Sequence, residues 1–299
     1  MTAVITTNSL TKSFKNHRAV DSLDLHVPEG SVYGFLGPNG SGKSTTMKML
    51  LGLTQPTHGE IELFGRELNP SSRTELLPAI GSMIEAPPGY GHLSGEENMR
   101  IVRDMLGLSN AQIDYALSTV RLTEHRTKLV RNYSLGMKQR LGIAMAIARS
   151  PSLLVLDEPT NGLDPAGIEE IRNLLVHLAH EGITVMVSSH LLDEIDKMAN
   201  VLGILSQGRM IFQGTRERLF EHSIPDLIIE TPDPEAVMAQ GIDATKTPDG
   251  LRVSGINKSQ TAEMIHRLAI ANVPIYEVRR VQQSLEDVFM DLTGREGLL

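Results

Sequence analysis

Cysteine and tryptophan are both absent from this chain, and only 4% of its residues are aromatic. Without cysteine, the protein has no disulfide scaffold, no thiolate metal site and no cysteine nucleophile. Basic residues are also fewer than acidic ones: the chain has 28 Lys and Arg and 36 Asp and Glu, which gives a formal net charge of −8. Sequence-independent nucleic-acid binding needs a basic field, so we expect no nucleic-acid partner.

Long apolar segments are missing as well. Runs such as Leu153–Leu156 and Ile183–Val187 are short, whereas a membrane-spanning helix needs about 20 apolar residues. The segment Met1–Leu10 has no basic region followed by an apolar core, which a secretory signal would need. We therefore expect a soluble, intracellular chain that works at a membrane only where another protein anchors it.

The composition that remains is typical of a folded protein, with 40% hydrophobic and 21% charged residues in a chain of 299. This length fits one large domain with an appendage, or two domains. We predict a main domain over residues 1–221 and a small α/β accessory domain over residues 222–299. In the second region, the expected strands are Asp226–Glu230, Leu251–Ser254 and Ile275–Val281, and the expected helices are Ser259–Asn272 and Ser284–Thr293.

A glycine-rich loop carries the strongest chemical signal. Residues 37–44 fit the pattern G-x-x-x-x-G-K-S, after an expected strand at Ser31–Leu36 and before an expected helix at Thr45–Leu53. Such a loop directs backbone N–H groups and a helix N-terminus at the phosphates of a nucleoside triphosphate. Lys43 would reach the β- and γ-phosphates, and the Ser44 hydroxyl would bind Mg²⁺. The expected nucleotide contacts are Gly37, Pro38, Asn39, Gly40, Ser41, Gly42, Lys43, Ser44 and Thr45.

Two carboxylates end the apolar run at residues 153–156. Asp157 is placed to organise Mg²⁺, and Glu158 is the candidate general base for a water that attacks the γ-phosphate. The strands at 153–156 and 183–187 are expected to be parallel and buried on both faces, with an amphipathic helix at Ile168–His180 as their crossover. A further strand is expected at Ala19–Val27, where apolar and polar residues alternate. Residues 86–150 read as a mostly helical insertion.

Further motifs resemble those of ATP-binding cassette (ABC) ATPases. Tyr133–Arg140 resembles the signature motif of that family, Asn161–Asp164 its D-loop, and His190 its switch histidine. Phe14 stands where the family places an aromatic ring against adenine. The motifs occur in the family's order over residues 3–215. The resemblance implies an α/β fold: a RecA-like P-loop core with an antiparallel β subdomain and a helical insertion.

The resemblance also implies how the site works. Two copies of the chain would close head-to-tail around two ATP molecules, so that Ser134 and Gly136 of one copy meet the γ-phosphate held by the other. Asp164 would lie in the D-loop at that interface, and His190 would sense the γ-phosphate. The family's ATPase subunits bind integral membrane permeases, so we expect a peripheral protein on the cytoplasmic face of the membrane.

The chain departs from the common family pattern at three positions. Leu135 and Met137 replace a glycine and a glutamine of the signature, so a ribose contact from residue 137 is not expected. Glu85 stands in place of a glutamine that touches Mg²⁺, and it keeps an oxygen ligand of the same reach. This Glu, and the Pro-rich stretch after it, resemble the branch that exports bacitracin and lantibiotic-type peptides for self-protection. The segment Ser284–Thr293 resembles drug-export cassettes.

Several alternatives stay open on the sequence. The chain could be a soluble ABC-family ATPase that takes no part in transport, or a regulatory module that binds nucleotide without hydrolysis. Phe14 could be a core aromatic, and His190 could be a packed histidine. His177 and His180 stand three residues apart on an expected helix, but we predict a solvated face rather than a metal site there.

Overall fold

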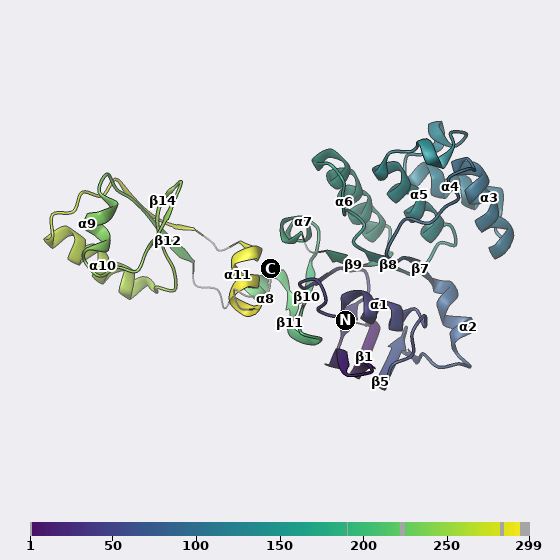
Figure 1. The fold of residues 1–299 in the computed structure, drawn as a ribbon, viewed down its shortest axis with the longest axis horizontal. Helices are drawn as coiled ribbons and strands as arrows, with labels where there is room; N and C mark the ends of the chain where they lie inside the picture. The colour runs from purple at the N-terminus through teal and green to yellow at the C-terminus, as the bar shows by residue number, and fades with distance from the viewer. Residues whose placement is uncertain (1, 190, 222–224, 282–283, 294–299) are drawn as a thin grey trace. The chain divides into compact units, whose positions relative to one another are not determined.

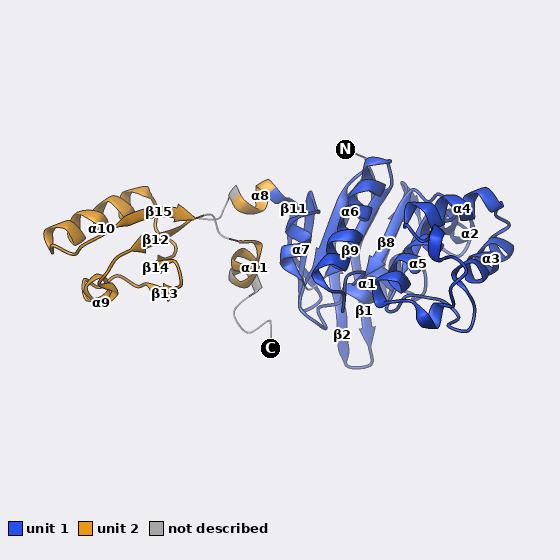
Figure 2. Ribbon diagram, turned by 90° about the horizontal axis from the view of Figure 1, so that it is seen from above, with its two compact units in different colours: residues 1–216, 293–299 blue, residues 217–292 orange. Residues whose placement is uncertain are grey.

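The computed structural model describes residues 2–189, 191–221, 225–281 and 284–293. The chain divides into two compact units, one of residues 1–216 with 293–299 and one of residues 217–292 (Figure 2). Within the described ranges, no helix has both the length and the apolar composition needed to cross a bilayer.

A six-stranded sheet with the order β11-β10-β4-β9-β8-β7 forms the centre of the large unit (Figure 1). Neighbouring strands run parallel from β10 to β7, and only β11 is antiparallel to its neighbour. Every residue of β4, β8 and β9 is buried. The strands are β4 (Val32–Leu36), β7 (Ile80–Met83), β8 (Leu153–Asp157), β9 (Thr184–Ser189), β10 (Val201–Ser206) and β11 (Arg209–Thr215).

Two of the helices that connect these strands were predicted from the sequence. Helix α1 (Lys43–Leu50) follows β4, and α6 (Pro165–His180) joins β8 to the parallel strand β9, which confirms the predicted crossover. The short helix α7 (Leu192–Asp196) lies between β9 and β10. Parallel strands that are buried on both faces need apolar side chains throughout, and the two apolar runs supply them.

An antiparallel sheet with the order β2-β1-β5-β6 forms the second sheet of this unit, and β3 pairs with β1. Its strands are β1 (Ala3–Phe14), β2 (His17–Leu23), β3 (His26–Pro28), β5 (His58–Leu63) and β6 (Arg66–Glu67).

The prediction of one strand over Ala19–Val27 was wrong, because β2 and β3 are separate. Strand β2 pairs with the second half of β1 and β3 with the first half. Between them, the Thr7 hydroxyl donates to the Leu23 carbonyl at 2.7 Å and accepts from the Leu25 N–H at 2.8 Å. The Thr7 side chain therefore forms hydrogen bonds with backbone groups that a continuous strand would pair with the backbone of β1. The alternating pattern runs through the break and conceals it.

The helical insertion follows β7, and its main helices lie together beside that edge strand (Figure 1). Two of them begin with reciprocal capping boxes, Ser94 with Glu97 and Ser109 with Gln112. Such caps satisfy N–H groups that the first helical turn leaves unpaired. The helices are α2 (Arg73–Leu76), before β7, and α3 (Gly95–Leu106), α4 (Asn110–Thr119) and α5 (Leu135–Ile147), after it, with 3₁₀ turns at Leu77–Ala79, Thr123–His125 and Val130–Asn132.

The small unit contains the predicted strands and helices of the second region. A four-stranded antiparallel sheet with the order β13-β14-β12-β15 has its own apolar core, which includes Leu227, Val253 and Leu268. Arg252 donates to Asp226 at 2.5 Å and to Asp287 at 2.7 Å. The elements after β11 are α8 (Arg216–Glu221), β12 (Asp226–Glu230), α9 (Pro234–Met238), β13 (Thr245–Thr247), β14 (Gly250–Val253), α10 (Lys258–Ile270), β15 (Glu277–Val281) and α11 (Leu285–Thr293).

Close packing at the centre of the sheet predicts a large effect from one added methyl group. A Cβ at Gly34 of β4 would overlap Ile195 Cγ2 and lie 3.1 Å from Ala199 Cβ. We expect Gly34→Ala to lower the free energy of unfolding by about 1–3 kcal/mol, as overpacked cores do, in denaturant titrations. Gly91→Ala is the control, because a Cβ there meets Arg131 Cβ at an ordinary 3.5 Å. Equal losses in both variants would contradict this account.

Candidate functional site

The glycine-rich loop lies where β4 ends and α1 begins, at the carboxyl edge of the parallel sheet. Gly42 has a φ of 106°. A Cβ on this residue would also overlap the carbonyl oxygen of Ala19. Both the backbone conformation and the space therefore require glycine directly before the helix. Ligands of open α/β sheets bind at this edge of the sheet.

A pocket of about 370 Å³ opens at the start of α1. Its lining combines the end of the first hairpin with the loop, the helix start and the end of β8. The lining residues are Phe14, His17, Ala19, Asn39, Gly40, Gly42, Lys43, Ser44, Thr45 and Glu158. The structure thus brings together Phe14, Glu158 and six of the nine loop residues expected to contact the nucleotide, whereas Gly37, Pro38 and Ser41 do not line the pocket.

Two lining residues, His17 and Ala19, were not predicted from the sequence. His17 pairs with Phe14 across the turn between β1 and β2. Their position depends on the pairing of these strands and on the approach of Ala19 to Gly42. No local motif signals either contact.

Lys43 is buried at the bottom of the loop. Its ammonium group donates to the carbonyl oxygens of Gly37 at 2.6 Å and Pro38 at 3.2 Å. Burial lowers the pKa of Lys43, while the negative charges of Glu158 and Asp157 act in the opposite direction. A polyphosphate would supply further negative charge to this ammonium group, so the site is built to accept an anion.

Asp157 ends β8 and is held by the neighbouring strand. The Ser188 hydroxyl of β9 donates to Asp157 Oδ1 at 2.5 Å, and Ser188 Oγ accepts the backbone N–H of Glu158 at 3.0 Å. The sequence analysis did not predict that Ser188 holds this carboxylate. A buried hydroxyl thus fixes both acidic residues of the motif at the edge of the sheet.

Glu158 has an unusual backbone conformation. Its φ is +50°, in the left-handed region that non-glycine residues rarely adopt. Such a conformation costs about 1–3 kcal/mol and persists only where the surroundings impose it. The hydrogen bond to Ser188 and the burial of Asp157 impose it here, and they bring Glu158 into the lining of the pocket.

Phe14 is an exposed ring at the mouth of this pocket and not a core aromatic. Its exposed fraction is 49%, and the Lys12 ammonium lies 5.1 Å from the ring centroid. An accessible ring beside a phosphate site can stack on a nucleobase. The alternative of a buried core aromatic is therefore wrong.

Glu85 lies outside the pocket lining. Its carboxylate pairs with Lys48 of α1, which lowers the pKa of Glu85. The predicted contact of Glu85 with Mg²⁺ stays a prediction, and it would require this carboxylate to turn away from Lys48.

The signature and D-loop residues also lie outside this pocket. Ser134 is exposed and caps α5, where its hydroxyl accepts from the Met137 N–H at 3.2 Å. Asp164 caps α6 by accepting from the Gly167 N–H at 3.0 Å. The two segments approach each other, since a Cβ at Gly136 would lie 3.7 Å from Leu163. His190 lies outside the described residues.

The oxygen atoms of Ser44 and Asp157 fit a hard divalent cation. One is a hydroxyl at the start of α1, and the other is a carboxylate at the end of β8. Such cations prefer oxygen ligands and often take only one or two from the protein, with the rest from substrate phosphates and water. Among the described residues, no group of three or more His, Cys, Asp or Glu is arranged to hold a metal ion.

Comparisons with known proteins agree on one family. A family model described as ABC transporter matches residues 20–161. The bacitracin transport ATP-binding protein BcrA of Enterococcus faecalis is 38% identical over 307 aligned positions, covering 100% of this chain and 99% of that protein. The lantibiotic transport ATP-binding protein SrtF of Streptococcus pyogenes is 45% identical over 205 positions, covering 69% of this chain and 88% of that protein.

Solved structures show the same cassette. CbiO1 of Clostridium perfringens, part of an ABC transporter complex, matches with a TM-score of 0.68 and 26% identity over 74% of this chain and 92% of that one. A dimeric bacterial ABC transporter cassette matches with a TM-score of 0.64 and 25% identity over 71% of this chain and 98% of that one.

Two lysines of α1 provide a matched test of the pocket. Lys43 lies in the pocket, whereas Lys48 pairs with Glu85 outside it. We expect Lys43→Ala to weaken ATP binding by about 10- to 100-fold, because charge-assisted hydrogen bonds to phosphate are lost. Lys48→Ala is expected to change it by less than about twofold, since exposed ion pairs contribute little. Calorimetric titration measures the ATP affinity of both variants. Equal losses of affinity would exclude this pocket as the phosphate site.

Proposed function

Because this chain belongs to the ABC transporter family of ATP-binding proteins, we propose that it hydrolyses ATP and powers export through separate permease subunits in the membrane. The alternative of a soluble ABC-family ATPase outside transport is less favoured, because the relatives that cover nearly all of this chain are transport ATP-binding proteins. We propose that it acts at the cytoplasmic face of the membrane.

In this proposal, residues 37–45 and Phe14 bind one ATP molecule. The backbone of the loop and the start of α1 surround the phosphates, and Lys43 exchanges its bonds to the Gly37 and Pro38 carbonyls for bonds to phosphate oxygens. Phe14 stacks on the adenine ring. The ring and the loop line the same pocket, which supports this orientation of the nucleotide.

Hydrolysis requires a base, an oriented water and charge neutralisation. Glu158 lies in the pocket beside the phosphate loop, and we assign it the role of general base. Ser44 and Asp157 are proposed to hold Mg²⁺, which would neutralise charge on the phosphates. His190 is proposed to contact the γ-phosphate. The presence of Glu158 in the pocket disfavours a regulatory module that only binds nucleotide.

The observation that carries the proposal is the separation, within one chain, of two sets of residues that we propose to bind phosphate. Ser134 and Gly136 begin α5 at an accessible helix N-terminus, which favours anions. They do not line the pocket that holds Lys43. A second copy, arranged head-to-tail, would bring its Ser134 to this pocket and complete the site. The similar cassette of known structure that forms a dimer supports this arrangement.

A substitution of Glu158 tests the dimer and the chemistry together. We expect Glu158→Gln to slow hydrolysis by about 10²–10⁴-fold, the usual contribution of a general base, and to leave ATP binding intact. The uncleaved nucleotide should then hold two copies together, so light scattering with Mg·ATP should give the mass of a dimer.

Ser134→Arg on this background supplies the control. The larger, charged side chain should prevent the dimer, while nucleotide binding by the single chain stays unchanged. A Glu158→Gln chain that remains monomeric with Mg·ATP would contradict the two-copy site, and so would a dimer that Ser134→Arg leaves intact.

We propose a peptide antibiotic of the bacitracin or lantibiotic type as the cargo. Relatives with these two transport activities in their names, at 38% and 45% identity, support this choice. Export of such a compound would protect the cell that expresses the transporter.

Drug susceptibility tests the cargo. Cells that express this chain with the membrane subunits that co-purify with it should tolerate more bacitracin or lantibiotic, and the Glu158→Gln chain should give no protection. Unchanged susceptibility to both compounds would contradict this cargo. Failure to recover any membrane subunit would contradict the transport role itself.

A further inference from the structure

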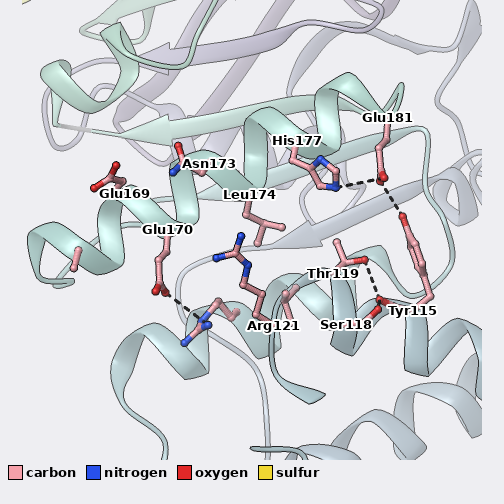
Figure 3. A pocket seen from close by; sticks show the side chains of 13 residues that line it. Tyr115, Ser118, Thr119, Arg121, Glu169, Glu170, Asn173, Leu174, His177 and Glu181 are labelled. Atoms are coloured by element: carbon pink, nitrogen blue, oxygen red, sulfur yellow. Dashed lines mark hydrogen bonds and ion pairs between the residues drawn. The ribbon is translucent and has the colours of Figure 1, made fainter. Parts of the chain in front are cut away.

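The helical insertion and α6 enclose a second cavity on the side of the large unit. Its volume is about 660 Å³. One wall comes from α4 and the residues that follow it, with Arg140 of α5, and the other comes from α6 and Glu181 (Figure 3). It shares no lining residue with the nucleotide pocket.

Two polar contacts join the walls across this cavity. The Tyr115 hydroxyl of α4 donates to Glu181 Oε2 at 2.9 Å, directly after the end of α6. Arg140 lies 3.6 Å from Glu170, nearer the start of α6. Figure 3 shows the Tyr115 side chain reaching from α4 to Glu181 on the opposite wall.

The contact at Tyr115 is the shorter of the two, and a second residue approaches the same carboxylate. His177 Nε2 lies 3.4 Å from the other carboxylate oxygen of Glu181. The hydrogen bond to Glu181 raises the pKa of Tyr115, so the hydroxyl keeps its proton. Tyr115 is 46% exposed, and its side chain therefore contributes little to the apolar core of either wall.

Helix α5 packs against β7, and across the cavity polar contacts join α4 to Glu181 and α5 to α6. Close-packed side chains fix the relative position of two layers, but a cavity provides no such contacts across its width. Helix α4 packs against α5, and α5 begins beside Ser134 and Gly136. A tilt of α4 away from Glu181 would therefore move the segment that is proposed to meet the ATP of a second copy.

We propose that Tyr115 and Glu181 are positioning residues that hold the signature helix α5 in the orientation in which it binds ATP in trans. The inference rests on the proposed ATP-dependent dimer. Neither residue touches the nucleotide. Loss of their contact lowers the fraction of copies with the competent orientation, and the apparent affinity falls with that fraction.

Kinetics of three variants test this role. Tyr115→Phe removes only the hydroxyl and is expected to raise the KM for ATP hydrolysis by about two- to tenfold, the effect of one hydrogen bond, with little change in kcat at saturating ATP. Glu181→Gln keeps an acceptor for the hydroxyl and should raise the KM less. Tyr276→Phe is the control, since this tyrosine is 70% exposed in the small unit and no hydroxyl contact is described for it. ATP binding by the single chain should be equal in all variants.

A reversible cross-link separates positioning from simple destabilisation. The chain has no native cysteine, so a short, cleavable thiol reagent can react only with the pair introduced in Tyr115→Cys, Glu181→Cys. We expect the pair to have a raised KM before cross-linking, a wild-type KM after it, and a raised KM again once the linker is cleaved.

The outcomes distinguish this inference from the proposed function. If the wild-type chain fails to hydrolyse ATP or to form the dimer, the proposed function fails. If the wild type is active but Tyr115→Phe leaves the KM unchanged, or the cross-link does not restore it, the positioning role is wrong and the proposed function stands.

Discussion

A positively charged group buried at the edge of a parallel sheet is the constraint on which the site depends. Lys43 can lie there because the loop before it directs the Gly37 and Pro38 carbonyls inward and because two carboxylates lie nearby. The loop takes this path because Gly42 has a backbone conformation and a contact with Ala19 that a side chain would prevent. Sheet order, loop and helix start are thus parts of one anion-binding arrangement.

The residues proposed to bind the γ-phosphate in trans lie on the helical insertion, away from the glycine-rich loop of the same unit. The signature segment begins a helix of the insertion, and the D-loop contacts it from the start of α6. In such an enzyme, the signature segment and the nucleotide pocket of one chain need not meet, because each can meet its counterpart on a second copy. In the proposed two-copy site, activity depends on how each copy presents α5, so contacts far from the nucleotide can affect catalysis.

Much of this could be predicted from the sequence, because the relevant patterns are local. The phosphate loop, the acidic strand end and the buried strands each occupy a few consecutive residues, and their geometry follows from residue type and order. The same holds for the helical insertion predicted over residues 86–150, where the structure has α3, α4 and α5.

The features that escaped prediction are contacts between distant segments. The break between β2 and β3 depends on the Thr7 hydroxyl, and the place of His17 in the pocket depends on strand pairing. The pairing of Glu85 with Lys48, and of Tyr115 with Glu181 across 66 positions, follows from the packed fold and leaves no trace in a local pattern. Sequence motifs identify the side chains that can take part in a site, and the tertiary structure determines which of these side chains contact one another.

The left-handed backbone of Glu158 has an evolutionary consequence. Glycine or asparagine would adopt this conformation with less strain, so a lineage selected only for a robust fold would drift toward them. In the role of general base proposed for it, Glu158 exchanges some conformational stability for a carboxylate in the pocket.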